Sequence, residues 1–206
     1  MTTQRVGHLP WQTVNQENVV AILDVPGFVA ELKEHAGEHK FHIHDERHFV
    51  ETYSMRQSWE VDLHPERACG GPIDLHLSLE VEPRTLLEFE DQVLDRLEMD
   101  DPPTGFFLPI VFTWVMPPLS EPPDLLVLAT DLAGVGGSDL PLKVSCVDST
   151  AEVTDAATRT LSITARVEIG LDDIYQHRDN LCDTLDRCHA VSEFLLDHAP
   201  LWLNEL

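Results

Sequence analysis

Basic residues are scarce in this chain. Its 206 residues include 13 lysines and arginines against 37 aspartates and glutamates, a formal net charge of −24. Such a surface repels phosphate backbones and anionic lipids, so nucleic-acid binding and membrane docking are disfavoured. A basic protein, a second copy of the chain or a metal cation remains as a partner. Because acidity also keeps a protein colloidally stable, a purely solubilising role stays open.

Long apolar runs are also missing. The longest apolar stretch, residues 106–118, is shorter than the roughly 20 residues that span a bilayer. Residues 1–14 contain no apolar segment typical of a signal-peptide core. We therefore expect a cytoplasmic protein without a membrane segment.

Diagnostic motifs are lacking as well. The four cysteines (Cys69, Cys146, Cys182 and Cys188) form no C-x-x-C pair, so reduced thiols are the expectation. There is no H-E-x-x-H sequence. The glycine-rich segment 134–138 lacks the Lys-Ser or Lys-Thr of a phosphate-binding loop, and we interpret it as a hairpin connection.

What the chain does contain is enough apolar sequence for a core. Hydrophobic residues make up 43% and charged residues 24% of the chain, as in ordinary globular proteins. The length suits a single globular unit, or two subdomains over residues 1–100 and 104–206. Residues 1–24 give mixed signals, and no element is assigned to them.

Alternating apolar residues predict a hairpin in the first half, between segments 57–63 and 73–81. Pairing Asp62 with His76 also sets Trp59 against Leu79, which matches charges on one face and apolar groups on the other. Strand structure is further expected around residues 41–54. The predicted helices of this half cover residues 26–36, ended by Gly37, and 84–98.

The second half predicts strands and one long helix. The strands are expected at residues 106–116, 124–131, 142–146 and 161–169, with a proline-rich loop at 117–123 and Lys143 opposite Glu168. The helix is expected at residues 171–198, ended by Pro200. Segments 75–82 and 161–168 share a hairpin-then-helix pattern, so the two halves are either a duplication or a chance similarity.

Together these patterns predict an α+β fold, with antiparallel sheet built from hairpins and packed by helices. The α-β-β-β-α order over residues 26–98 resembles the small domains of bacterial secretion chaperones. The resemblance is one of architecture, and it implies a protein-binding role.

Histidines are concentrated between the first helix and the first strand. His35 and His39 are four residues apart, and His42 and His44 share one face of a strand. Imidazoles are zinc ligands, so these four residues are candidate metal ligands. We nevertheless expect a solvated, histidine-rich connection that binds no cofactor, with a zinc site as the alternative.

A second cluster lies on the predicted hairpin and consists of Asp62, His64, Cys69, Asp74 and His76. A carboxylate beside an imidazole orients many general bases, and a cysteine in a glycine-rich loop can act as a nucleophile. The same residues are also ordinary cross-strand ion pairs. We expect a non-enzymatic, intracellular protein-binding module, chaperone-like or regulatory, with a metal-dependent or Asp/His-based enzyme as the alternative.

Overall fold

The computed structural model describes residues 23–71, 73–95, 101–150, 158–178 and 181–203. In chain order the elements are α1 (Val25–Glu38), β1 (Phe41–Val50), β2 (Gln57–Pro65), the 3-10 turn η1 (Glu66–Ala68), β3 (Asp74–Val81), α2 (Pro83–Asp95), β4 (Phe107–Val115), α3 (Leu125–Gly136), β5 (Leu142–Ser149), β6 (Thr158–Gly170), α4 (Leu171–Tyr175) and α5 (Cys182–Leu203). None of these helices is long and apolar enough to cross a membrane.

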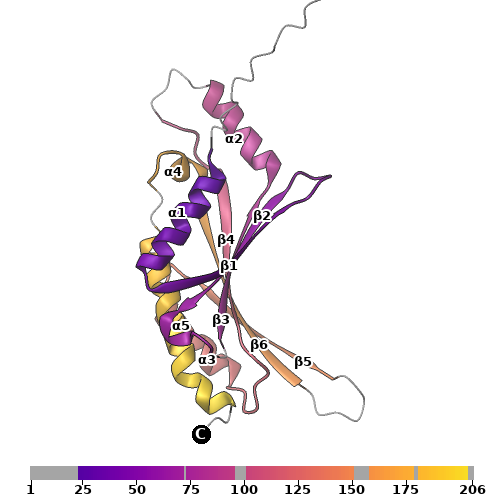
Figure 1. Cartoon of the computed structure of the whole chain (residues 1–206), viewed down its shortest axis with the longest axis vertical. Coiled ribbons are helices and arrows are strands. Elements are labelled where there is room, and N and C mark those ends of the chain that lie inside the picture. The colour runs from indigo at the N-terminus through magenta and orange to yellow at the C-terminus, as the bar shows by residue number, and fades with distance from the viewer. Residues whose placement is uncertain (1–22, 72, 96–100, 151–157, 179–180, 204–206) are drawn as a thin grey trace, which may run out of the picture.

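One antiparallel sheet organises the fold. Its six strands lie in the order β1-β2-β3-β4-β6-β5, and every neighbouring pair is antiparallel. Helices α1, α3 and α5 lie along one side of this sheet (Figure 1). The predicted α+β class is confirmed. Strand β4 pairs with both β3 and β6, so it joins the two halves of the chain.

The predicted register of the first hairpin is confirmed. Asp62 lies opposite His76, and Trp59 lies opposite Leu79. The apolar positions of both strands are buried on the helix side, while Asp62 and His76 point to the other face. Alternation therefore fixed the faces, because a slip of one residue would expose every apolar side chain, and the match of Asp62 with His76 fixed the register.

The first helix starts as expected and ends later than expected. Asp24 caps it by accepting a hydrogen bond from the Gly27 amide at 2.9 Å, and Pro26 lies in its first turn. The helix continues through Gly37 to Glu38, and His39 caps it. The helix predicted at 84–98 is observed as α2, and residues 96–98 lie outside the described part.

The strand predicted at 124–131 is wrong, because this segment is helix α3. Asp124 is its N-cap and accepts hydrogen bonds from the amides of Leu126 and Val127. Leu128 and Leu132, four residues apart, are buried at helical spacing. Segment 134–138 is therefore the end of a helix and not a hairpin connection.

The predicted long C-terminal helix is observed as α5, but it does not extend over all of 171–198, because residues 171–175 form the separate helix α4. The chain turns after Tyr175, where His177 adopts a left-handed backbone (φ 51°). Pro200 does not end α5, which continues to Leu203. Trp202 is buried and its carbonyl accepts a hydrogen bond from the Glu121 amide at 3.0 Å, which holds this last turn.

The register predicted for the second hairpin is wrong by four residues. Lys143 lies opposite Thr164, and not opposite Glu168. A shift of four leaves every side chain on its expected face, so burial did not distinguish the two registers. The observed register instead pairs Asp148 with Arg159, whose guanidinium donates to both carboxylate oxygens at 2.6 and 2.8 Å.

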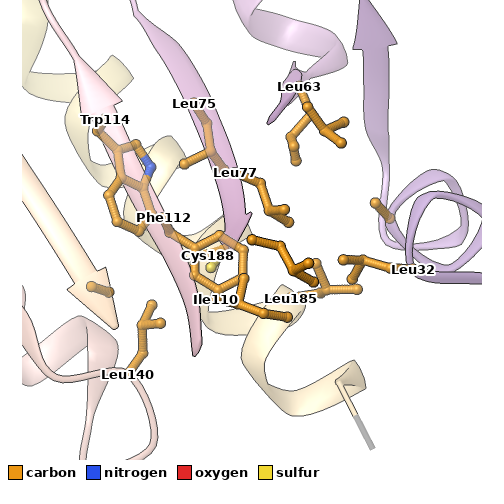
Figure 2. Packing of buried hydrophobic residues seen from close by; sticks show 14 of the residues in the cluster. Leu32, Leu63, Leu75, Leu77, Ile110, Phe112, Trp114, Leu140, Leu185 and Cys188 are labelled. Atoms are coloured by element: carbon orange, nitrogen blue, oxygen red, sulfur yellow. The ribbon is translucent and has the colours of Figure 1, made fainter. Parts of the chain in front are cut away.

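The core fills the space between the sheet and the helices (Figure 2). Ile110, Phe112 and Trp114 of β4 are fully buried, and they meet Leu185 and Cys188 of α5. The indole of Trp114 donates a hydrogen bond to the buried hydroxyl of Ser192 at 2.9 Å. This core fixes α5 against the sheet.

Candidate metal-binding site at the sheet edge

The site begins where edge strand β1 meets the end of β2. His42 lies opposite His64, and the register then shifts between Ile43 and Asp45. His44 is the extra residue of this bulge. Its ring stacks on that of His64, with 4.1 Å between the centroids. A bulge at the edge of a sheet therefore brings three histidines together.

The turn after β2 adds a thiol. The η1 turn reverses the chain, and Gly70 follows with a left-handed backbone (φ 73°) that favours glycine. Cys69 Sγ consequently lies 3.2 Å from His42 Nδ1 and 3.2 Å from His64 Nε2.

The geometry of this cluster suits a metal ion. Ligand atoms of His42, His44 and Cys69 all lie within 4.8 Å of one another. Zinc bonds of about 2.0–2.3 Å place neighbouring tetrahedral ligand atoms roughly 3.3–3.8 Å apart. All three residues are exposed, so an ion can reach them from solvent. The widest separation would have to shorten by at most about 1.0–1.5 Å for tetrahedral coordination.

His64 lies behind these three residues and is 7% exposed. Its Nδ1 is 3.8 Å from the Asp74 carboxylate, while its Nε2 faces the thiol of Cys69. Burial, followed by the neighbouring His44, lowers the pKa of His64 from its ordinary value. The neutral imidazole can donate one hydrogen bond to the Cys69 sulfur and orient it.

The thiol-bearing turn is anchored to α5. Arg67 of η1 donates hydrogen bonds to Glu193 at 2.7 Å and to Asp197 at 2.6 Å. The bonds to Asp197 and then Glu193 raise the pKa of Arg67. The turn before Cys69 is thereby linked to the helix that packs on the sheet.

Two of the four predicted metal ligands lie elsewhere. His39 Nδ1 lies 2.7 Å from the Asp186 carboxylate. His35 belongs to α1, and its buried Nδ1 has no hydrogen-bond partner among the described residues. Because α1 continues past Gly37, both histidines stay with the helix, while His42 and His44 follow the strand.

The second predicted cluster is also divided. His64 and Cys69 join His42 and His44, with Asp74 beside His64. Asp62 and His76 instead form a hydrogen-bonded pair on the open face of the sheet. Arg47 donates to both oxygens of Asp62 at 3.0 and 3.1 Å and to Glu60 at 3.1 Å. The ion pairs of Arg47 with Asp62 and Glu60 explain the position of Asp62 beside His76 without a catalytic role.

The observed site therefore combines halves of two predicted clusters. The signal that was missed is the pairing of β1 with β2, which sets His42 opposite His64.

Comparison of the chain with protein-family models, with curated proteins and with solved structures finds no match. The resemblance to secretion chaperones stays a prediction from element order alone.

Proposed function

We propose that the protein is a metal-binding module that holds one ion of the zinc class through His42, His44 and Cys69. The observation that carries the proposal is the approach of these three ligand atoms to within 4.8 Å of one another. In the described residues this group combines two imidazoles and a thiol from segments that are distant in sequence. The fourth position is open to water or to a group of a partner.

The donor set selects the kind of metal. Nitrogen and sulfur ligands suit zinc and other late first-row ions, whereas magnesium and calcium require oxygen ligands. A reducing compartment keeps a thiol available as a ligand, which agrees with the expected intracellular location.

Exposure favours binding over catalysis. Because all three ligands are exposed, a substrate would gain little enclosure or exclusion of water at this ion. In the Asp62–His76 pair, the other candidate for chemistry, the carboxylate already accepts hydrogen bonds from Arg47. The enzyme alternative is therefore less well supported than the binding role.

A bound ion would act on the fold. It would tie the bulge of β1 to the turn that carries Cys69, which Arg67 already links to α5. At a zinc concentration of 100 times Kd, such binding stabilises the folded state by about 2.7 kcal/mol. For a chain of this size we expect Tm to rise by roughly 5–10 °C.

Cobalt titration of the metal-free protein tests the proposal. We expect one Co(II) per chain, a thiolate-to-metal absorption band and the intense visible bands of tetrahedral cobalt. Cys69→Ser should remove the thiolate band, while His42→Ala and His44→Ala should each weaken binding strongly.

Two replacements outside the site provide matched controls. His177→Asn changes an exposed histidine and keeps a residue that tolerates its backbone. Cys182→Ser changes an exposed cysteine at the start of α5. Both should bind cobalt as the unmodified protein does. A thiolate band that survives in Cys69→Ser and disappears in Cys182→Ser would contradict the proposal.

A further inference from the structure

A second surface of the molecule has the features of a protein-docking site. The first turn of α3 exposes Leu125 (39%), Leu126 (77%) and Val127 (58%), and the last turn of α5 exposes Leu201 (58%). The two turns are neighbours, because the Glu121 amide before α3 donates to the Trp202 carbonyl at 3.0 Å. We call these four residues the apolar end patch. It lies at the end of the molecule where α3 and α5 meet (Figure 1).

The helix itself does not explain this exposure. Helix α3 buries Leu128 and Leu132 against the protein, so its opposite side should be polar in an ordinary surface helix. Leu126 and Val127 occupy that side instead. Single exposed apolar residues are common, but a cluster of large ones at one end of a molecule indicates an interaction surface.

The charge around the patch identifies the kind of partner. The sequence contains no lysine or arginine in residues 116–136 or 188–203, the described segments that carry the patch and the residues next to it along the chain. Glu121, Asp124 and Asp131 beside the patch are exposed. Asp124 caps α3, where a carboxylate complements the positive end of the helix dipole.

Among the described residues, three arginines from other segments reach this region, and each has contacts. Arg67 donates to Asp197 of α5, four residues before Leu201. Arg159, whose carbonyl accepts the Leu119 amide, is held by Asp148. Arg187 donates to the Val135 carbonyl at the other end of α3, at 3.3 Å. Each of these arginines is bonded to another group, whereas Glu121, Asp124 and Asp131, the charged residues beside the patch in α3 and the loop before it, are all acidic and exposed.

We infer that the apolar end patch docks a cationic, amphipathic segment of a partner protein, with apolar side chains over Leu126 and Val127 and lysines or arginines at the acidic rim. An anionic membrane would be repelled by Glu121, Asp124 and Asp131. A second copy would bring the same acids face to face, so like charges oppose a symmetric dimer through this patch. The surface is separate from the metal site, and neither proposal depends on the other.

Two labelled peptides test this inference by fluorescence anisotropy with the full chain. One is an 18-residue helix of leucine and lysine with its leucines on one face. The other has the same composition, scrambled so that no apolar face forms. Because a chain of net charge −24 attracts any cationic peptide, the difference between the two affinities measures docking. We expect the amphipathic peptide to bind at least about tenfold more tightly.

The variants separate docking from charge attraction. Leu126→Glu makes the protein more negative, so general attraction predicts equal or tighter binding, whereas docking at the patch predicts loss of the tenfold preference. A glutamate in the first turn of a helix is compatible with its dipole, so the variant should fold. Leu87→Glu, at an exposed leucine of α2 (58%), is the matched control and should keep the preference.

Three results would overturn the inference. The first is equal affinity for the two peptides, and the second is a preference that Leu126→Glu leaves intact. The third is evidence that something other than a cationic segment occupies the patch. Such evidence would be association of the protein with phosphatidylserine vesicles, or a dimer in sedimentation velocity that Leu126→Glu dissociates. The inference is supported if the protein is a monomer, does not bind the vesicles and binds the amphipathic peptide more tightly than the scrambled one.

Discussion

Replacing His64 should weaken metal binding without abolishing it. The side chain lies 3.2 Å from the Cys69 sulfur and is buried, so its neutral imidazole can donate a hydrogen bond to a metal-bound thiolate. Hydrogen bonds to charged groups contribute about 1.5–3 kcal/mol, and outer-sphere partners of metal ligands typically change affinity 10–100-fold. For His64→Ala we therefore expect zinc affinity to fall about 10–100-fold, measured by competition with a chromophoric chelator.

Conservative variants make this expectation sharper. His64→Gln keeps an N–H donor near the position of Nε2, so it should recover part of the lost affinity. Asp74→Asn should cost only a few-fold, because the carboxylate is exposed and 3.8 Å away. An affinity unchanged in His64→Ala would refute the positioning role. A fall in zinc affinity of more than about 1,000-fold would also refute the positioning role, because so large a loss would indicate that His64 binds the metal directly.

Three further outcomes test the fold. Ser192→Ala should destabilise the protein by about 1–3 kcal/mol in urea, because the buried Trp114 indole loses its acceptor. Leu185→Ala should cost about 2–5 kcal/mol in the same assay, since this leucine is fully buried. Arg159 lowers the pKa of Asp148, so the stability from this pair is present at neutral pH and lost as the pH falls below about 4. Arg159→Gln should raise the pKa of Asp148 in a carboxyl NMR titration, and an unchanged value would contradict the pairing.

The sequence predicted the first hairpin because two independent patterns agreed on it. Apolar alternation fixed the faces, and the match of Asp62 with His76 fixed the register. The second hairpin lacked that agreement. Its predicted register rested on the single pair of Lys143 and Glu168. In the observed register, shifted by four residues, Lys143 lies opposite Thr164, yet every side chain stays on its predicted face.

Helix α3 was mistaken for a strand because its sequence is apolar on nearly every side. A short apolar run has no periodicity that separates a strand from a helix. The useful signal was local: Asp124 follows two prolines and caps the first turn. The exposed Leu126 and Val127 that hid the helical pattern both belong to the apolar end patch.

The metal site was predicted in parts and not as a whole. His42, His44, His64 and Cys69 were all singled out, but in two separate clusters. Their convergence depends on the pairing of β1 with β2, the bulge at His44 and the η1 turn. These are features of tertiary structure that spacing along one segment does not reveal.

Native mass spectrometry of the protein, purified without a histidine tag and loaded with zinc, tests the central claim most directly. The account predicts a mass of one zinc per chain for the unmodified protein and for His177→Asn. It predicts a metal-free mass for the double variant His42→Ala, His44→Ala. A metal-free mass for the unmodified protein, or one zinc retained by the double variant, would contradict it.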